Sequence, residues 1–229
     1  MKTIATIITF VALATLVGPA SFAADKDGFV SLFNGKDLTG WKMGPDKSWV
    51  VEDGVIALKR DSFDAKEHNS DYLWAANPYG NFIVELEFKI QEKANSGIYL
   101  RTGDPKNPVP TGIEVQVINS FGKSELHNRA TAGAVYDFQA PSKNAVKAPG
   151  EWNKYRITCK DSRITVVLNG EQVIDMDVNQ WSEVGKNPDG SKNKFPVALK
   201  DFARKGHFGF QDHGVPVWYR NIRVKDLDR

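Results

Sequence analysis

The chain has 229 residues, of which 11% are aromatic, and its formal net charge at neutral pH is +2. This near balance of acidic and basic side chains gives no case for nucleic acid or an acidic membrane surface as a partner. A single cysteine, Cys159, excludes an internal disulfide. Because Cys159 alternates with Tyr155 and Ile157, we expect a buried thiol rather than a nucleophile.

The first 23 residues have the pattern of a secretory signal peptide. Lys2 supplies a positive start, and residues 4–17 form an apolar run that is too short for a membrane span of about 20 residues. Small residues, Ser21 and Ala23, precede the expected cleavage point. We therefore expect a protein that is periplasmic or secreted and not inserted in the membrane after cleavage, with residues 24–229 forming a single domain.

The mature chain carries many short runs in which apolar and polar residues alternate with period two, the pattern of half-buried strands. In the first half, the segment 28–41 is expected to hold a short strand and a tight turn at Asn34–Gly35. Further strands are expected at 72–74 and 81–90, with a hairpin over 49–58 that turns at Asp53–Gly54. In the second half, they are expected at 133–138, 152–160, 163–169, 172–177, 206–214 and 217–224.

The segment 179–205 lacks strand character and is expected to be a long ordered loop, a kind of segment that often forms a lid. No long amphipathic helix is predicted anywhere in the mature chain. Strands at this spacing, separated by turn signals, predict an all-β fold, an antiparallel jelly-roll β-sandwich. Two sheets would then stack their apolar faces and leave an outer sheet face available for a ligand.

Two central strands, residues 96–101 and 112–117, are the most informative part of the sequence. Alternation predicts that Tyr99, Arg101, Glu114 and Gln116 point to one face of the sheet, away from the apolar side chains. A cation, a carboxylate, an amide and a phenol can together bind hydroxyl and carbonyl groups. The alternative is an ordinary solvated face. The ligand hypothesis requires Arg101 and Glu114 to lie on the same side of the sandwich.

Several motifs, in order along the chain, resemble the 3-keto-disaccharide hydrolase domain family. They are LFNGKDLTGW at 32–41, NSGIYLR at 95–101, EVQV at 114–117, GEWN at 150–153, LNG at 168–170, FQDHG at 210–214 and WYRNI at 218–222. The resemblance implies a concanavalin A-like, laminin-G-like jelly roll. It also implies an exported bacterial protein, since members of the family are typically exported. Some members cleave 3-keto-glycosides, so the resemblance implies this activity as well.

The chemistry implied by this resemblance begins at the carbon next to a ketone. A ketone at C3 acidifies the C2 hydrogen, so that a base can remove it and the enolate can expel the C1 substituent, with or without addition of water. Glu114 or His213 is the candidate base, and Arg101 or Gln116 would hold the enolate oxygen or orient the sugar. Together, Glu114, His213 and Arg101 are the candidate catalytic residues.

The expected substrate contacts are Gln116, Tyr99, Tyr136, Asp137, Gln211 and Asp212, of which Tyr136 or Asp137 could also protonate the leaving group. No cofactor is expected, and no metal-binding motif is present. A divalent ion held by Asp212, His213 and Glu114 stays open as a possibility. The partner is expected to be a small carbohydrate.

Two other functions compete with this one. Retaining glucanases of similar fold place two carboxylates about 5 Å apart on one strand, but Glu114 is followed at the same parity by Gln116 and Ile118. Direct hydrolysis of that kind is therefore disfavoured. A non-catalytic carbohydrate-binding module could instead use Trp41, Trp74, Trp181 or Tyr219 as platforms. A purely structural domain of the envelope is a third possibility.

Overall fold

The computed structural model describes residues 23–44, 47–59 and 71–228. The predicted signal peptide therefore lies outside the described residues, apart from Ala23. In the described part of the chain, no helix is long and apolar enough to cross a bilayer.

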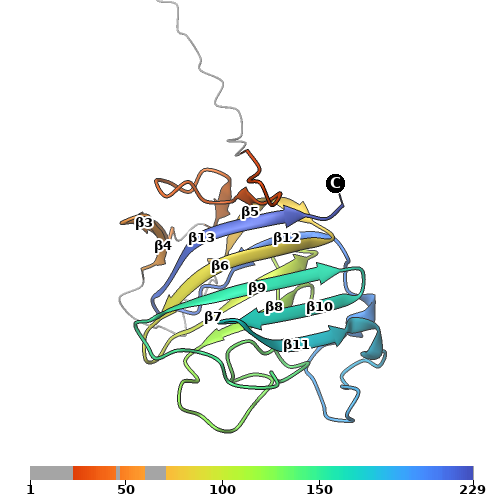
Figure 1. Ribbon diagram of the computed structural model, residues 1–229. Coiled ribbons are helices and arrows are strands. Elements are labelled where there is room, and N and C mark those ends of the chain that lie inside the picture. Colours follow the sequence, from red (N-terminus) through yellow and green to blue (C-terminus); the bar gives the residue numbers. More distant parts are fainter. Residues whose placement is uncertain (1–22, 45–46, 60–70, 229) are drawn as a thin grey trace, which may run out of the picture.

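Two antiparallel sheets stack face to face (Figure 1). The larger sheet has eight strands, in the order β11 (Glu171–Asp177), β10 (Arg163–Leu168), β9 (Trp152–Lys160), β6 (Phe82–Ile90), β13 (Val217–Asp226), β4 (Val55–Leu58) and β3 (Trp49–Glu52), with β1 (Val30–Ser31) paired to β13. The smaller sheet has five strands, in the order β2 (Trp41–Met43), β5 (Leu73–Tyr79), β12 (Gly206–Phe210), β7 (Asn95–Thr102) and β8 (Ile113–Ile118). The predicted all-β jelly roll is confirmed.

The core lies between the two sheets and is built by the predicted alternation. On β6, Val84, Leu86 and Phe88 are at most 1% exposed and face the smaller sheet. Across the interface, Phe210 stacks on Tyr219 with ring centroids 3.9 Å apart. These large apolar side chains fix which face of each strand turns inward, so the opposite face can carry polar or ligand-binding side chains.

Cys159 behaves as expected, because it is fully buried in this core. Burial raises the pKa of its thiol to about 12, since the charged thiolate is disfavoured away from water. The side chain is therefore a packing element and not a reactive group. The predicted hairpin tip is also confirmed, because Asp53 and Gly54 both have positive φ.

One predicted strand is wrong. Residues 133–138 are no strand but an irregular segment bound along the edge of β8. Tyr136 N donates to Glu114 O and Gln116 N donates to Ala134 O, both at 2.9 Å. Asp137 has φ 66°, which breaks the extended conformation after a single bridge. The predicted long loop at 179–205 is confirmed. This segment lies within Val178 to Lys205, which holds two short 3-10 helices, η1 (Val178–Gln180) and η2 (Leu199–Asp201), and one isolated bridge between Lys186 and Lys192.

Candidate active site on the outer face of the five-stranded sheet

One row of residues crosses the outer face of the five-stranded sheet. Trp74 of β5 pairs with Gly209 of β12. Gly209 also pairs with Tyr99 of β7, which in turn pairs with Glu114 of β8. Tyr72, Trp74 and Tyr99 form a cluster of their own, separate from the core. The side chains of this row therefore project away from the eight-stranded sheet.

Two glycines make room for the larger side chains of this face. A Cβ at Gly209 would lie 2.9 Å from Trp74 Cζ3, and a Cβ at Gly97 would lie 2.7 Å from both Cγ and Cδ of Glu114. These separations are far shorter than van der Waals contact. The Trp74 ring thus lies over Gly209, and the carboxylate arm of Glu114 lies over Gly97, one strand away from its own backbone.

A chain of hydroxyl and amide contacts ends at Glu114. Tyr99 donates its hydroxyl to Glu114 Oε2 at 3.0 Å. Tyr72 OH lies 3.5 Å from Tyr99 OH, and Gln211 Nε2 donates to Tyr72 OH at 3.3 Å. The Tyr72 ring stacks on Trp74 at 5.4 Å, while Tyr99 meets both rings edge-on. This packing fixes the phenol that touches the carboxylate.

The environment of Glu114 changes its acidity. The side chain is only 8% exposed, and burial raises its pKa from 4.5 to about 7. The hydrogen bond from Tyr99 and the positive charge of Lys194 act in the opposite direction, since both favour the carboxylate. Burial, together with the negative charge of Glu114, raises the pKa of Tyr99, so its phenol stays protonated. Near neutral pH, Glu114 is thus poised to accept a proton.

Two buried glutamine oxygens flank this carboxylate. Gln116 pairs with Gly97 across β8 and β7, and Gln211 N donates to Gly97 O from the other side. Gln116 Oε1 and Gln211 Oε1 are buried, and neither accepts a hydrogen bond within the part of the chain that the structure describes. Thr102 Oγ1 and His207 Nδ1, on a neighbouring cross-strand pair, share this condition. Buried polar atoms without hydrogen-bond partners are costly, so a ligand with hydroxyl groups, which both donate and accept, would match them.

Arg101 does not belong to this face, and the sequence prediction that it shares a side with Glu114 is wrong. The ligand hypothesis therefore fails in the form that needs both residues, and the site that is left rests on Glu114 and the side chains around it. Arg101 has φ 50°, and the pairing of β7 with β12 shifts register at the same place. The bulge inverts the alternation and turns Arg101 toward the interior, where it is 1% exposed. Its guanidinium donates to Gly80 O and Asp161 O, each at 2.8 Å, and joins two turns between strands.

Asp137 is held by other parts of the protein. Its Oδ1 accepts from Arg129 Nε at 2.5 Å and its Oδ2 accepts from the backbone N–H of Lys194 at 2.8 Å. Both carboxylate oxygens are thus engaged in fixing two loops, which argues against a proton-donor role. Tyr136 is half-buried next to the site, and its ring lies 4.5 Å from Lys194 Nζ.

The segment after β12 brings Asp212 and His213 near the end of the site. Asp212 is 4% exposed, and its Oδ1 accepts from Gly214 N at 2.8 Å, which shapes the turn. His213 is half-buried. The strand ends at Phe210 and not at Gly214 as predicted, so His213 lies outside the strand. A catalytic role for His213 stays a prediction. Among the described residues, no three of His, Cys, Asp or Glu are grouped closely enough to hold a metal ion.

Two residues of the site were missed in the sequence. The sequence pattern indicates only that Tyr72 belongs to a strand, although its parity with Trp74 places both side chains on the same face. Lys194 lies in the long loop between η1 and η2, and no periodicity could have placed it. Its position follows from contacts distant in sequence, because Phe195 stacks on Phe138 at 4.4 Å.

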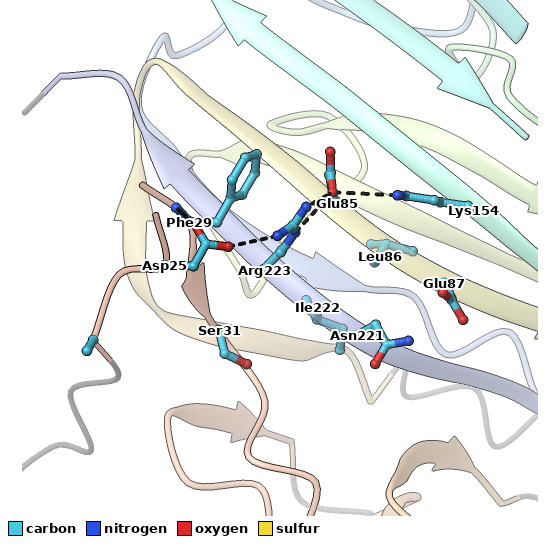
Figure 2. A pocket seen from close by; sticks show the side chains of 11 residues that line it. Asp25, Phe29, Ser31, Glu85, Leu86, Glu87, Lys154, Asn221, Ile222 and Arg223 are labelled. Atoms are coloured by element: carbon cyan, nitrogen blue, oxygen red, sulfur yellow. Dashed lines mark hydrogen bonds and ion pairs between the residues drawn. The ribbon is translucent and has the colours of Figure 1, made fainter. Parts of the chain in front are cut away.

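A pocket of about 440 Å³ lies on the other side of the molecule, on the outer face of the eight-stranded sheet (Figure 2). Its charged groups neutralise one another. Arg223 binds both Glu85, at 2.7 Å, and Asp25, at 2.8 Å. Arg156 also forms an ion pair with Glu85, and Lys154 lies 3.8 Å from it. These contacts lower the pKa of Glu85 despite its burial. Nothing in this arrangement favours proton transfer.

The two sheets and the aromatic, polar outer face define a concanavalin A-like jelly-roll protein. A carbohydrate-binding module of Bacillus subtilis has the same fold, with a TM-score of 0.50 and 13% identity over 82% of this chain and 96% of that one. A candidate glycosyl hydrolase of Parabacteroides distasonis is more similar. It has a TM-score of 0.75 and is 31% identical over 87% of this chain and 99% of its own.

The model of the 3-keto-alpha-glucoside-1,2-lyase-like domain family matches residues 28–225, and the chain belongs to this family. A 3-keto-disaccharide hydrolase of Bacteroides thetaiotaomicron is 29% identical over 232 residues, covering 89% of this chain and 80% of the relative. The resemblance noted in the sequence is thus confirmed. These relatives also support an enzyme of the glycoside hydrolase type.

Proposed function

We propose that this protein cleaves the glycosidic bond of 3-keto-glycosides, including 3-keto-disaccharides, with Glu114 as the base. The observation that carries the proposal is the buried Glu114 carboxyl, whose pKa of about 7 makes it a proton acceptor near neutral pH. The matching family and the similarity to a 3-keto-disaccharide hydrolase support the choice of substrate.

In the first step, Glu114 takes the proton from C2 and the electron pair delocalises onto the C3 oxygen as an enolate. The enolate then collapses, a C1=C2 double bond forms, and the C1–O bond breaks. The departing oxygen takes up a proton from solvent water, and Glu114 returns the C2 proton to solvent, so charge and atoms balance. Addition of water across the double bond returns a free 3-keto sugar and converts the elimination into a net hydrolysis. A base positioned within hydrogen-bond reach contributes about 10²–10⁴ to the rate of such a step.

Other residues of the face hold the sugar. Gln116 and Gln211 would accept hydrogen bonds from ring hydroxyls, because their buried oxygens have no donor among the described residues. Trp74 and Tyr72 would form the apolar wall that pyranose rings pack against. Tyr99 keeps Glu114 in place through the hydrogen bond at 3.0 Å. We further propose that the protein is exported and that it works without a resident cofactor.

A non-catalytic carbohydrate-binding module is the second candidate. The stacked Tyr72 and Trp74 rings and the unpaired amide oxygens favour it, since both are also typical of sugar-binding surfaces. A binding module does not explain why the pKa of the Glu114 carboxyl lies near neutral pH.

The test is turnover of a 3-keto-glucoside with a chromogenic aglycone by the purified protein and by Glu114→Gln. We expect release of the aglycone by the wild type and a loss of about 10³-fold in the variant. Binding of the sugar by both proteins without turnover would instead establish the binding module. Release that survives in Glu114→Gln would reject the proposed base.

A further inference from the structure

The proposed reaction needs a hydrogen-bond donor or a positive group near the C3 oxygen, where negative charge develops when C2 loses its proton. Arg101 and Gln116 are the sequence candidates for this role, but the guanidinium of Arg101 is turned into the interior and bound to backbone carbonyls, and the amide nitrogen of Gln116 donates to Arg129 O at 2.6 Å. The other described side chains around Glu114 are phenols, amides, an indole and the imidazole of His207, and the nearby Arg129 is paired with Asp137. Lys194 is the cation whose charge reaches the Glu114 carboxyl.

Lys194 is brought to the site by a rigid connection. Its backbone N–H donates to Asp137 Oδ2 at 2.8 Å, and the next residue, Phe195, stacks on Phe138 at 4.4 Å. The segment that carries Asp137 is in turn bound to β8, because Tyr136 N donates to Glu114 O at 2.9 Å. The backbone of Lys194 is thus fixed relative to Glu114 through one intermediate segment.

The side chain of Lys194 is directed by an aromatic ring. Its Nζ lies 4.5 Å from the ring centroid of Tyr136, a cation–π contact. The Nζ also lies 5.7 Å from the Phe195 ring centroid, and the side chain is otherwise exposed. No ion pair within the described ranges includes Lys194. An ammonium group whose charge acts on a buried carboxylate, without an ion pair to it, is free to interact with a charged ligand.

We propose that Lys194 is the catalytic cation that stabilises the enolate oxygen when Glu114 removes the C2 proton. This inference rests on the proposed function and names a residue in a segment that no sequence motif marks. Lys194 makes no covalent bond in this role. Its ammonium group interacts more strongly with the enolate than with the neutral ketone, so its effect falls mainly on kcat.

The test compares Lys194→Gln, which removes the charge, with Lys194→Arg, which retains it, and with Lys192→Gln as a control two residues away. We expect Lys194→Gln to lower kcat about 10²–10³-fold with little change in KM, and Lys194→Arg to retain most of the activity. Lys192→Gln is expected to behave as the wild type. Equal activity of Lys194→Gln and wild type would overturn the inference.

A second measurement separates this inference from the proposed function. The carboxyl group of Glu114 is titrated by carbon NMR in the wild type and in Lys194→Gln. We expect the Glu114 pKa to rise in Lys194→Gln, because the positive charge that favours the carboxylate is lost. An unchanged pKa would overturn the inference even if the wild type is active. A wild type inactive on every 3-keto-glycoside would reject the proposed function, and Lys194 as a catalytic residue with it.

Discussion

The protein contains two buried glutamates that occupy equivalent places on opposite sides of the sandwich. Glu85 lies on the outer face of the eight-stranded sheet and is 6% exposed, while Glu114 lies on the outer face of the five-stranded sheet and is 8% exposed. Glu85 is surrounded by Arg223, Arg156 and Lys154, which lower its pKa. Glu114 meets a phenol and a single cation, and burial raises its pKa to about 7.

The comparison shows that burial alone does not decide what a carboxyl group does. Three cations offset the desolvation of Glu85, so it stays ionised and joins strands of the sheet. Too little positive charge surrounds Glu114 to offset its desolvation, so its proton is exchanged near neutral pH. The first arrangement stabilises the fold, whereas the second costs stability and makes a base available.

The largest expected effect separates the two glutamates by activity. Glu114→Gln should lower kcat/KM on a 3-keto-glycoside about 10³-fold, because the amide cannot accept the C2 proton. Glu85→Gln should keep the activity of the folded protein within a few-fold of the wild type. Steady-state kinetics of both variants, after circular dichroism has confirmed their fold, make the measurement. If Glu114→Gln and Glu85→Gln lost similar amounts of kcat/KM, the assignment of Glu114 as the base would be wrong.

The next effect concerns the space that Glu114 occupies. Gly97→Ala would place a methyl group 2.7 Å from Cγ and Cδ of Glu114, so the carboxylate must move off its position. We expect a loss of about 10²-fold in kcat. Gly103→Ala is the matched control, since its Cβ would meet nothing closer than 3.8 Å. If Gly97→Ala were as active as Gly103→Ala, the position of Glu114 would not matter for the reaction.

Removal of the charge of Glu114 and removal of the charge of Glu85 should change the free energy of unfolding in opposite directions. The folded pKa of Glu114, about 7, exceeds its ordinary value of 4.5, so the free energy of unfolding falls as pH rises between these values. Glu114→Gln should therefore be more stable than the wild type at pH 8, by up to about 3 kcal/mol.

Glu85 has a lowered pKa, so its contribution is present above its ordinary pKa and is lost as pH falls through the folded value. Glu85→Gln should be less stable than the wild type at pH 8, by about 1–2 kcal/mol, since its partners are partly exposed. Urea unfolding at pH 5 and pH 8 measures both changes. A shift of the same sign for the two variants at pH 8 would contradict the comparison.

Arg101 should affect stability and not chemistry. Arg101→Lys retains the charge but cannot reach Gly80 O, Asp161 O and Asn81 together, so we expect a loss of about 1–3 kcal/mol. The folded fraction should turn over substrate within a few-fold of the wild type. Thermal unfolding and kinetics at a temperature where the variant is folded provide the readouts. If Arg101→Lys were as stable as the wild type but inactive, Arg101 would have a role in the reaction.

The smallest effect is a shift of the pH profile. Activity should fall below about pH 7, as Glu114 becomes protonated. Tyr99→Phe removes a hydrogen bond that favours the carboxylate, so the acid limb should move to higher pH. We expect a roughly tenfold loss at pH 6 and a smaller loss at pH 8. An acid limb that stays in place would show that Tyr99 does not act on the titrating group.

The sequence predicted the sheets well, because alternation and turn residues are local signals. Strands β6, β7, β8, β9, β10 and β11 lie where the pattern placed them, and so do Tyr99, Glu114 and Gln116. The bulge at Arg101 was not predictable, because an arginine with positive φ within a strand does not change the alternation of apolar and polar residues in the sequence. Lys194 and the edge segment 133–138 depend on contacts between distant parts of the chain, which periodicity does not encode.

The central claim is that Glu114 removes the proton from C2 before the glycosidic bond breaks. The most direct measurement uses a 3-keto-disaccharide deuterated at C2, with wild type and Glu114→Gln, and a control without protein. We predict that the wild type releases this deuterium to water as it cleaves the bond, more slowly than it cleaves the protonated substrate, and that Glu114→Gln does neither. Cleavage at an unchanged rate, with deuterium retained at C2, would contradict the account.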